Sequence, residues 1–175
     1  ERYALLNRAQ WQQLEQRLSR FSPYILDQYP DLLMLKTWLI YHHGRWAELP
    51  AALQRLELAL AQASEPREKR KHLQGEMSAL RSLLSYFAAD PEKALTWARQ
   101  SIEETPRELW IVRILARLFL AVSLQMMGDT SQAYAARWKL SSKLFTDSTG
   151  FDCDKAPLPA SQMVTVPSSP PVATM

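Results

Sequence analysis

Three short segments, each of which interrupts an apolar helical pattern, constrain the fold of this chain more than any other feature. They are HHGRWAEL at residues 42–49, FAADPEKAL at 87–95 and MMGDTSQAY at 126–134. Each places a small residue directly after an apolar run, and these residues, Gly44, Ala89 and Gly128, follow one another at intervals of 45 and 39 residues. Recurrence at the length of a helix pair predicts antiparallel pairs of helices stacked into a right-handed array.

The composition supports an all-α fold, because Leu, Ala, Gln, Arg and Glu lose little free energy on entering a helix and the chain has only 4 Gly. Proline positions and turn signals predict helices near residues 2–20, 23–28, 31–43, 46–63, 67–88, 91–104, 108–127 and 130–145. No segment alternates with period two for long enough to predict a strand. We therefore expect a tetratricopeptide-like solenoid of degenerate helix pairs, longer than the usual repeat of about 34 residues.

The composition changes at Thr146. Residues 1–145 form the predicted helical repeat domain, whereas residues 146–175 are rich in Pro, Ser and Thr and have no helical period. Such a segment buries too little apolar surface to offset the entropy of ordering, so we expect a disordered tail. Its last six residues, PPVATM, are similar to a fusion-vector linker, and a chain that opens on Glu1 without an initiator methionine is expected to be part of a longer protein.

The net charge and the cysteine content bear on where the protein is found and what it binds, and not on a reaction that it catalyses. The net charge of +3 is mild, and the basic residues at 67–71 are interrupted by Glu68, so nucleic-acid binding by this segment is not expected. With one cysteine, Cys153, and no signal-peptide pattern, the chain is expected in the cytoplasm. The apolar run 109–127 carries Arg113 and Arg117, which favours a packed helix over a membrane span.

No catalytic or metal-binding pattern is present. The sequence lacks nucleophile elbows, catalytic Cys/His signatures and metalloprotease motifs, so we expect no enzyme activity and no cofactor. His42 and His43 lie about 100° apart on a helix, whereas a shared metal needs a spacing of three or four residues. The adjacent histidines are therefore expected to close a helix rather than to hold a metal.

The stretch LLNRAQWQQLEQRLSRFSPYILDQYPDLLMLKTWLIYHHGRWAEL, residues 5–49, resembles the start of the helical-repeat region in MalT-like, LuxR-type ATP-dependent transcriptional regulators. The resemblance rests on a Trp-containing first helix, a turn with Phe-Ser-Pro, a Tyr-Pro-x-Leu segment, the apolar helix with Trp38 and a Gly-Arg turn. It continues more weakly through GDTSQAYAA at 128–136. The resemblance implies a sensor scaffold between an ATP-binding module and a DNA-binding helix-turn-helix.

Three features depart from that pattern. The chain contains no Gly-x-x-x-x-Gly-Lys-Ser/Thr loop and no terminal helix-turn-helix, and Leu49 stands where the family prefers alanine. The first interpretation is therefore a non-catalytic sensor or scaffold segment that binds an effector or partner and acts on modules outside this chain. The alternative is a free-standing tetratricopeptide-like adaptor for protein–protein interaction.

The repeat register also predicts a binding groove. The inward positions of the first helices of the three pairs are Met34, Trp38, Tyr41 and His42, then Glu76, Leu83, Tyr86 and Phe87, then Leu118, Val122, Gln125 and Met126. A surface of this kind suits an apolar ligand, a helix of the parent protein or a partner helix, and self-association stays open. Equally open is that neighbouring helices cover it. We expect His42 to face the groove beside Trp38 and Tyr41, with His43 a quarter-turn away.

Overall fold

The computed structural model describes residues 2–136, and all the regular structure in that range is helical. The helices are α1 (Arg2–Asn7), α2 (Trp11–Leu18), α3 (Pro23–Gln28), α4 (Pro30–His42), the short 3-10 helix η1 (Trp46–Glu48), α5 (Leu49–Gln62), α6 (Arg67–Phe87), α7 (Pro91–Glu104) and α8 (Trp110–Met126). Residues 130–136 are also helical. The all-α prediction is confirmed for this range, whereas the predicted tail at 146–175 lies outside the described residues.

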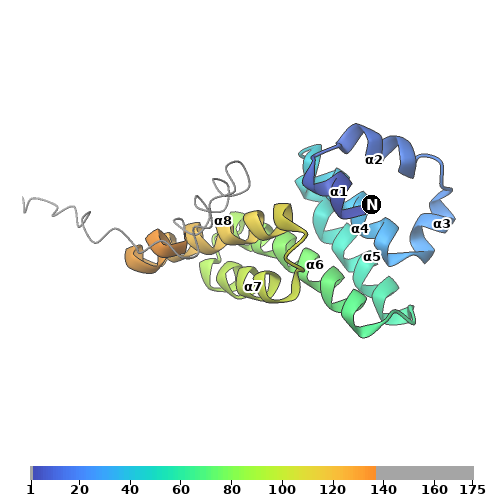
Figure 1. Ribbon diagram of the computed structural model, residues 1–175. Coiled ribbons are helices and arrows are strands. Elements are labelled where there is room, and N and C mark those ends of the chain that lie inside the picture. Colours follow the sequence, from blue (N-terminus) through green and yellow to red (C-terminus); the bar gives the residue numbers. More distant parts are fainter. Residues whose placement is uncertain (1, 137–175) are drawn as a thin grey trace, which may run out of the picture.

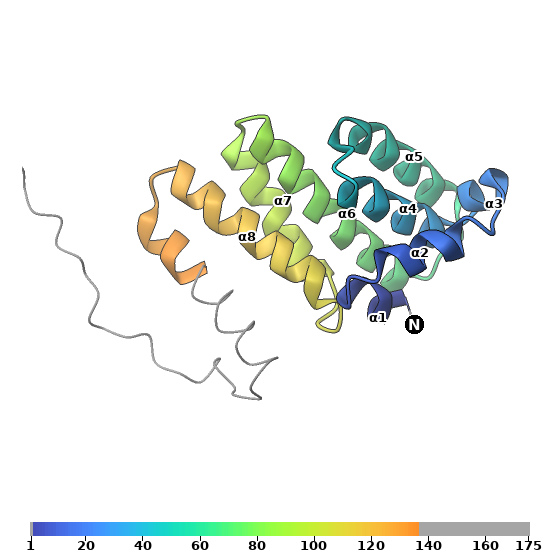
Figure 2. The same cartoon turned by 90° about the horizontal axis from the view of Figure 1, so that it is seen from above.

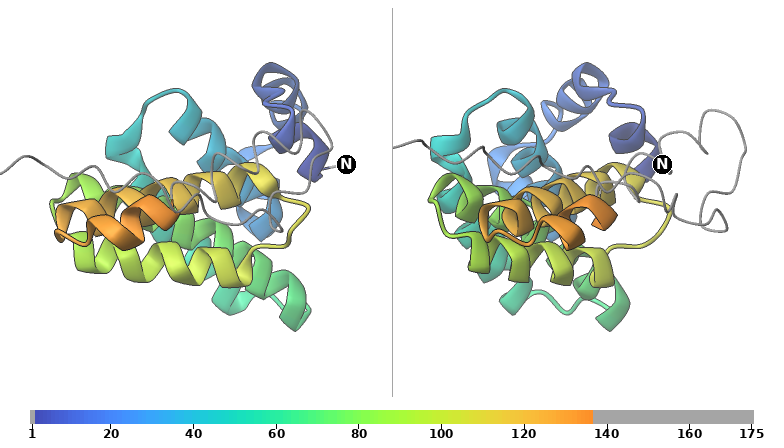
Figure 3. Two further views of the ribbon diagram at one scale, coloured as in Figure 1. Left: turned by 60° about the vertical axis from the view of Figure 1, so that its left-hand side comes forward. Right: turned by 90° about the vertical axis from the view of Figure 1, so that its left-hand side faces the viewer.

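From α4 onward the helices follow one another along the molecule in chain order, from α4 and α5 at one end to residues 130–136 at the other (Figures 1 and 2). Helices α6, α7 and α8 pack closely on one another, and α4 packs on α5 and less extensively on α6. Helices α2 and α3 pack on α4, and α2 lies on the side of the molecule opposite α7 (Figure 3). The core is built mainly from leucines on the facing sides of these helices.

The three predicted turns share one backbone geometry. Gly44, Ala89 and Gly128 have φ angles of 69°, 56° and 81°, the left-handed region that ends helices. In each turn the following amide donates to a carbonyl five residues back, at 3.1 Å after Gly44 and 3.0 Å after Ala89 and Gly128. This cap explains Gly44 and Gly128, because glycine has no Cβ atom to be strained there, whereas Ala89 adopts the same backbone with a Cβ atom.

The first predicted helix, residues 2–20, is wrong in its extent. Ala9 adopts a φ of 51°, and the amides of Ala9 and Gln10 donate to Leu6 and Leu5, so that the same type of cap divides the segment into α1 and α2. An alanine carries no turn signal in sequence, because left-handed backbone is ordinarily a property of glycine and asparagine. The division frees α1 to fold back toward α6 and α8.

The apolar helix α8 is packed within the protein. Its Arg113 guanidinium donates to the carbonyls of Ile102 and Thr105, at 2.6 and 2.7 Å, and so satisfies free carbonyls at the end of α7. Burial, together with the nearby Arg117 and Arg107, lowers the pKa of Arg113. Among the described helices, none combines the length and the apolar character that a membrane span needs.

Candidate functional site

The predicted groove residues fall into two groups. Met34, Trp38, Glu76 and Leu83 are buried in the core, so they contact other residues of this chain. Tyr41 and Tyr86 are half-buried, and His42, Phe87, Gln125 and Met126 are exposed. The second group, together with the exposed Leu118 and the half-buried Val122 of α8, is accessible to a partner and lies toward the ends of α4, α6 and α8.

The buried group is organised around the carboxylate of Glu76. The Arg2 guanidinium of α1 donates to both of its oxygens, at 2.7 and 2.8 Å, and the indole N–H of Trp38 donates to Oε2 at 2.8 Å. Burial by itself lowers the pKa of Arg2, but attraction and hydrogen bonding to Glu76, together with attraction to Asp31 and Tyr3, outweigh it, and the pKa lies above its usual value. A carboxylate at 0% exposure is thereby paired and hydrogen-bonded, as buried charge requires.

Further contacts fix α1 in this position. The Asn7 amide donates to the Glu108 carbonyl at 2.6 Å, and the Ile111 amide donates to the Asn7 side-chain oxygen at 3.3 Å. The Tyr3 hydroxyl lies 3.4 Å from Nδ1 of His72. The chain's own first helix therefore covers the part of the expected groove around Glu76, which is the covered alternative that the sequence left open.

The two adjacent histidines lie near different residues of α2. The His42 ring stacks on Trp11, with 4.7 Å between ring centroids and 19° between planes, and not on the buried Trp38. Nε2 of His43 lies 3.5 Å from a carboxylate oxygen of Glu15. Within residues 2–136, no cluster of three or more His, Cys, Asp or Glu side chains is arranged to hold a metal ion.

An exposed aromatic row joins three parts of the molecule. It consists of Trp46, Phe87 and Tyr86, with successive ring centroids 4.8 and 5.4 Å apart, and at its inner end Tyr86 packs on the buried Phe119 at 5.4 Å. Phe87 is 56% exposed and Trp46 is 41% exposed. Sequence reasoning selected Tyr86 and Phe87 but missed Trp46, because its position follows from the turn after α4 and not from a helical period.

The predicted residues at the far end of the array border a separate hollow. Leu118, Val122 and Gln125 of α8 line a space of about 510 Å³ together with Tyr134. Met126 is 48% exposed on the same helix. This end of the array therefore adds apolar surface that is separate from the covered region at Glu76.

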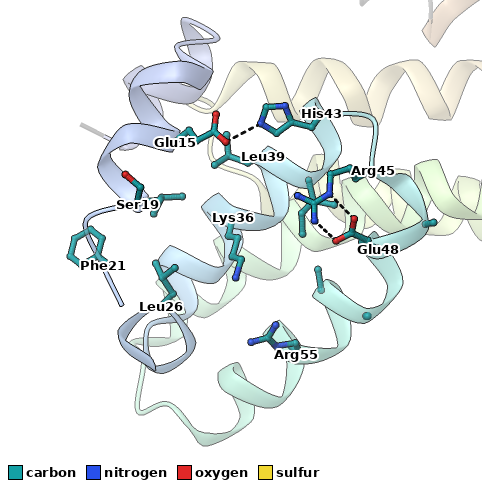
Figure 4. Close-up of a pocket in the computed structure, with 15 residues that line it drawn as sticks. Glu15, Ser19, Phe21, Leu26, Lys36, Leu39, His43, Arg45, Glu48 and Arg55 are labelled. Carbon is teal, nitrogen blue, oxygen red and sulfur yellow. Dashed lines mark hydrogen bonds and ion pairs between the residues drawn. The ribbon is translucent and has the colours of Figure 1, made fainter. Parts of the chain in front are cut away.

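A hollow that sequence reasoning missed lies between α2, α3, α4 and α5 (Figure 4). We call it the N-terminal hollow, and its volume is about 620 Å³. Leu18, Leu26, Leu39 and Ile40 form its buried apolar lining. These side chains come from three helices that are separate in sequence, so no local pattern indicates the hollow.

Most charged groups around the N-terminal hollow are paired. Arg45 donates to both oxygens of Glu48 at 2.6 and 2.5 Å, and Arg55 donates to both oxygens of Asp27 at 2.6 and 2.7 Å. The hydrogen bond from Arg45 lowers the pKa of Glu48. Lys36 also lines the hollow, and its ammonium group has no ion-pair or hydrogen-bond partner among the described residues.

Comparison with known proteins gives one consistent similarity. The chain is 28% identical over 131 residues to the HTH-type transcriptional regulator MalT of Yersinia enterocolitica, a match that covers 75% of this chain and 14% of that regulator. It is likewise 28% identical over 140 residues to the MalT regulators of Yersinia pestis and Yersinia pseudotuberculosis, covering 74% of this chain and 15% of theirs. The chain is therefore similar to one region of a much longer transcriptional regulator.

No protein-family profile matches the chain, and no solved structure matches it.

Proposed function

We propose that this chain is a non-catalytic sensor or scaffold segment of a MalT-like, LuxR-type transcriptional regulator. The observation that carries the proposal is the match to MalT over three quarters of this chain but only a seventh of the regulator. In this proposal the segment binds an effector or a partner, and the ATP-binding and DNA-binding modules lie outside the printed residues. The function needs no cofactor in this segment.

The turn geometry supports a tetratricopeptide-like arrangement of the segment. The breaks at Gly44, Ala89 and Gly128 share one cap, and α7 packs on both α6 and α8, as the second helix of a stacked pair does. We propose that α4 with α5, α6 with α7, and α8 with residues 130–136 are successive pairs of a right-handed array. Such arrays present an extended concave surface to partners.

The aromatic row is the surface that we propose for contact with a protein partner or another module of the regulator. Exposed aromatic side chains that touch one another supply large contact areas at low entropic cost, and they are common anchors of interfaces. Phe87, at 56% exposure, lies at the centre of the row.

A regulator of transcription acts beside DNA, so we propose a cytoplasmic location and contact with DNA through the other modules only.

The coding sequence on either side of this chain tests the proposal. We expect a Gly-x-x-x-x-Gly-Lys-Ser/Thr loop upstream and a helix-turn-helix downstream in one reading frame. A complete gene that lacks both would overturn the regulator proposal and favour a free-standing adaptor.

A biochemical assay of the printed chain gives a second test. We expect no ATP hydrolysis and no sequence-specific DNA binding, since neither motif occurs in its sequence. ATP turnover that a single substitution in this chain abolishes would contradict a non-catalytic role.

A further inference from the structure

We propose that the N-terminal hollow binds a small amphipathic anion, with its apolar body against the leucine lining and its single anionic group on Lys36. This inference rests on the proposed sensor function, for which it supplies the chemical class of the effector. The volume of about 620 Å³ falls within the range of about 300–1,000 Å³ that is usual for small-molecule sites.

The lining favours an apolar body. Leu18 and Leu26 are 6% and 7% exposed, and Leu39 and Ile40 are 8% and 9% exposed, so each presents only a small edge to the hollow. Together they form an apolar wall contributed by α2, α3 and α4. A hydrocarbon or aromatic group placed against this wall removes apolar surface from water, which stabilises the complex by roughly 25 cal/mol per Å².

The charges determine the polar end of the ligand. The guanidinium groups of Arg45 and Arg55 are already held by carboxylates, and His43 lies against Glu15. Lys36 alone among the lining cations is without such a partner in the described part of the chain, and Figure 4 shows its side chain extending into the space between Leu26 and Arg55. A monoanion satisfies Lys36 without breaking the neighbouring pairs.

Other ligand charges fit less well. A cation in this position is repelled by the Lys36 ammonium, and a neutral apolar molecule removes water from that ammonium without replacing the lost hydrogen bonds. A dianion needs a second cation, and each remaining guanidinium is already bonded to a carboxylate. Of the two lining carboxylates, Glu48 is held by Arg45 and Glu15 lies 3.5 Å from His43, so one negative charge on the ligand matches the remaining unpaired charge of Lys36.

Two fluorescent probes of similar shape test the proposal on the whole printed chain. 1-Anilinonaphthalene-8-sulfonate carries an apolar body and one negative charge, and N-phenyl-1-naphthylamine is its neutral counterpart. We expect Lys36→Met to weaken binding of the anionic probe about ten-fold or more, because a hydrogen bond to a charged group contributes about 1.5–3 kcal/mol. Binding of the neutral probe should change less than about two-fold.

The matched control is Lys71→Met, which removes the charge of an exposed lysine on α6. It should leave the affinity for both probes unchanged, and Lys36→Arg should retain most of the affinity for the anionic probe. Unchanged binding of the anionic probe to Lys36→Met would overturn the proposal. So would equal losses for both probes, since these would indicate a packing effect and not a charge effect.

A second variant locates the probe. Ala51 is exposed and lines the N-terminal hollow, so Ala51→Trp should fill the space and abolish binding of both probes while circular dichroism stays unchanged. Persistent binding to this variant would place the probe elsewhere, for example on the aromatic row, and would refute the assignment. Probe binding to this chain tests the anion site, whereas the flanking coding sequence tests the regulator proposal. Either proposal can therefore be refuted while the other stands.

Discussion

Replacing Arg2 by Met tests whether one ion pair holds α1 over the array. The substitution keeps an apolar stem but removes the two hydrogen bonds of 2.7 and 2.8 Å to Glu76, whose carboxylate then has only the Trp38 indole as donor. Breaking a buried ion pair by removing one partner costs about 3–5 kcal/mol, because the other charge stays buried. Since the Arg2 side chain is 19% exposed, we expect a cost near 3 kcal/mol.

Urea denaturation followed by circular dichroism measures this cost. With a denaturant slope of about 2 kcal/mol per M, a loss of about 3 kcal/mol lowers the midpoint by about 1.5 M. The double variant Arg2→Met/Glu76→Gln removes both charges but keeps an oxygen acceptor for the buried Trp38 indole, so it should recover most of the loss.

The control is Arg8→Met, which removes an exposed arginine just after α1 and should shift the midpoint by less than about 0.25 M. If Arg2→Met has as small an effect as Arg8→Met, the pair does not hold α1, and the reasoning about the covered region at Glu76 is refuted.

Two further variants test local packing and capping. Gly75→Ala should destabilise the protein by about 1–3 kcal/mol in urea denaturation. The added Cβ atom would lie 2.8 Å from the Thr105 amide nitrogen and 2.9 Å from the Glu104 carbonyl carbon, and this clash outweighs the gain in helix propensity. Equal or greater stability of the variant would contradict this close approach. The Lys93 side chain and amide lower the pKa of Asp90, so its stabilising contribution is present above the unfolded pKa of about 4 and is lost as the pH falls through the lower folded value. Asp90→Asn should therefore flatten the decline of thermal stability between pH 5 and 3, and an unchanged profile would contradict this role.

The turns could be predicted from the sequence because their signals are local. Gly44 and Gly128 adopt the left-handed backbone that favours glycine, and Ala89 was recognised because Asp90 and Pro91 follow it. Ala9 adopts the same backbone without any such neighbour, so the division of the first helix had no signal in sequence.

The groove could be predicted only in part, because its covering helix comes from a distant segment. Helical periodicity placed Glu76 and Phe87 on one face of α6, but Arg2 lies 74 residues before Glu76 and covers one end of that face. Glu76, a carboxylate on the apolar face of α6, was the available signal, since a buried charge requires a partner.

The N-terminal hollow depends entirely on tertiary structure. Leu18, Leu39 and Ala51 lie on three different helices, and each has an ordinary packing role in its own helical period. Periodicity identifies which face of a helix is apolar, but it does not determine how completely neighbouring helices fill the space between them.

Transcription from a target promoter is the most direct test of the central claim, that this segment gives a regulator a binding surface. The parent gene carries either Phe87→Glu, which places a charge in the aromatic row, or Gln54→Glu, which adds the same charge at an exposed position of α5 outside the row. At equal protein levels, we expect Phe87→Glu to change transcription by about ten-fold or more, since a central aromatic anchor contributes about 2 kcal/mol, and Gln54→Glu to leave it unchanged. Transcription that is the same for both variants and the unsubstituted regulator would contradict the claim.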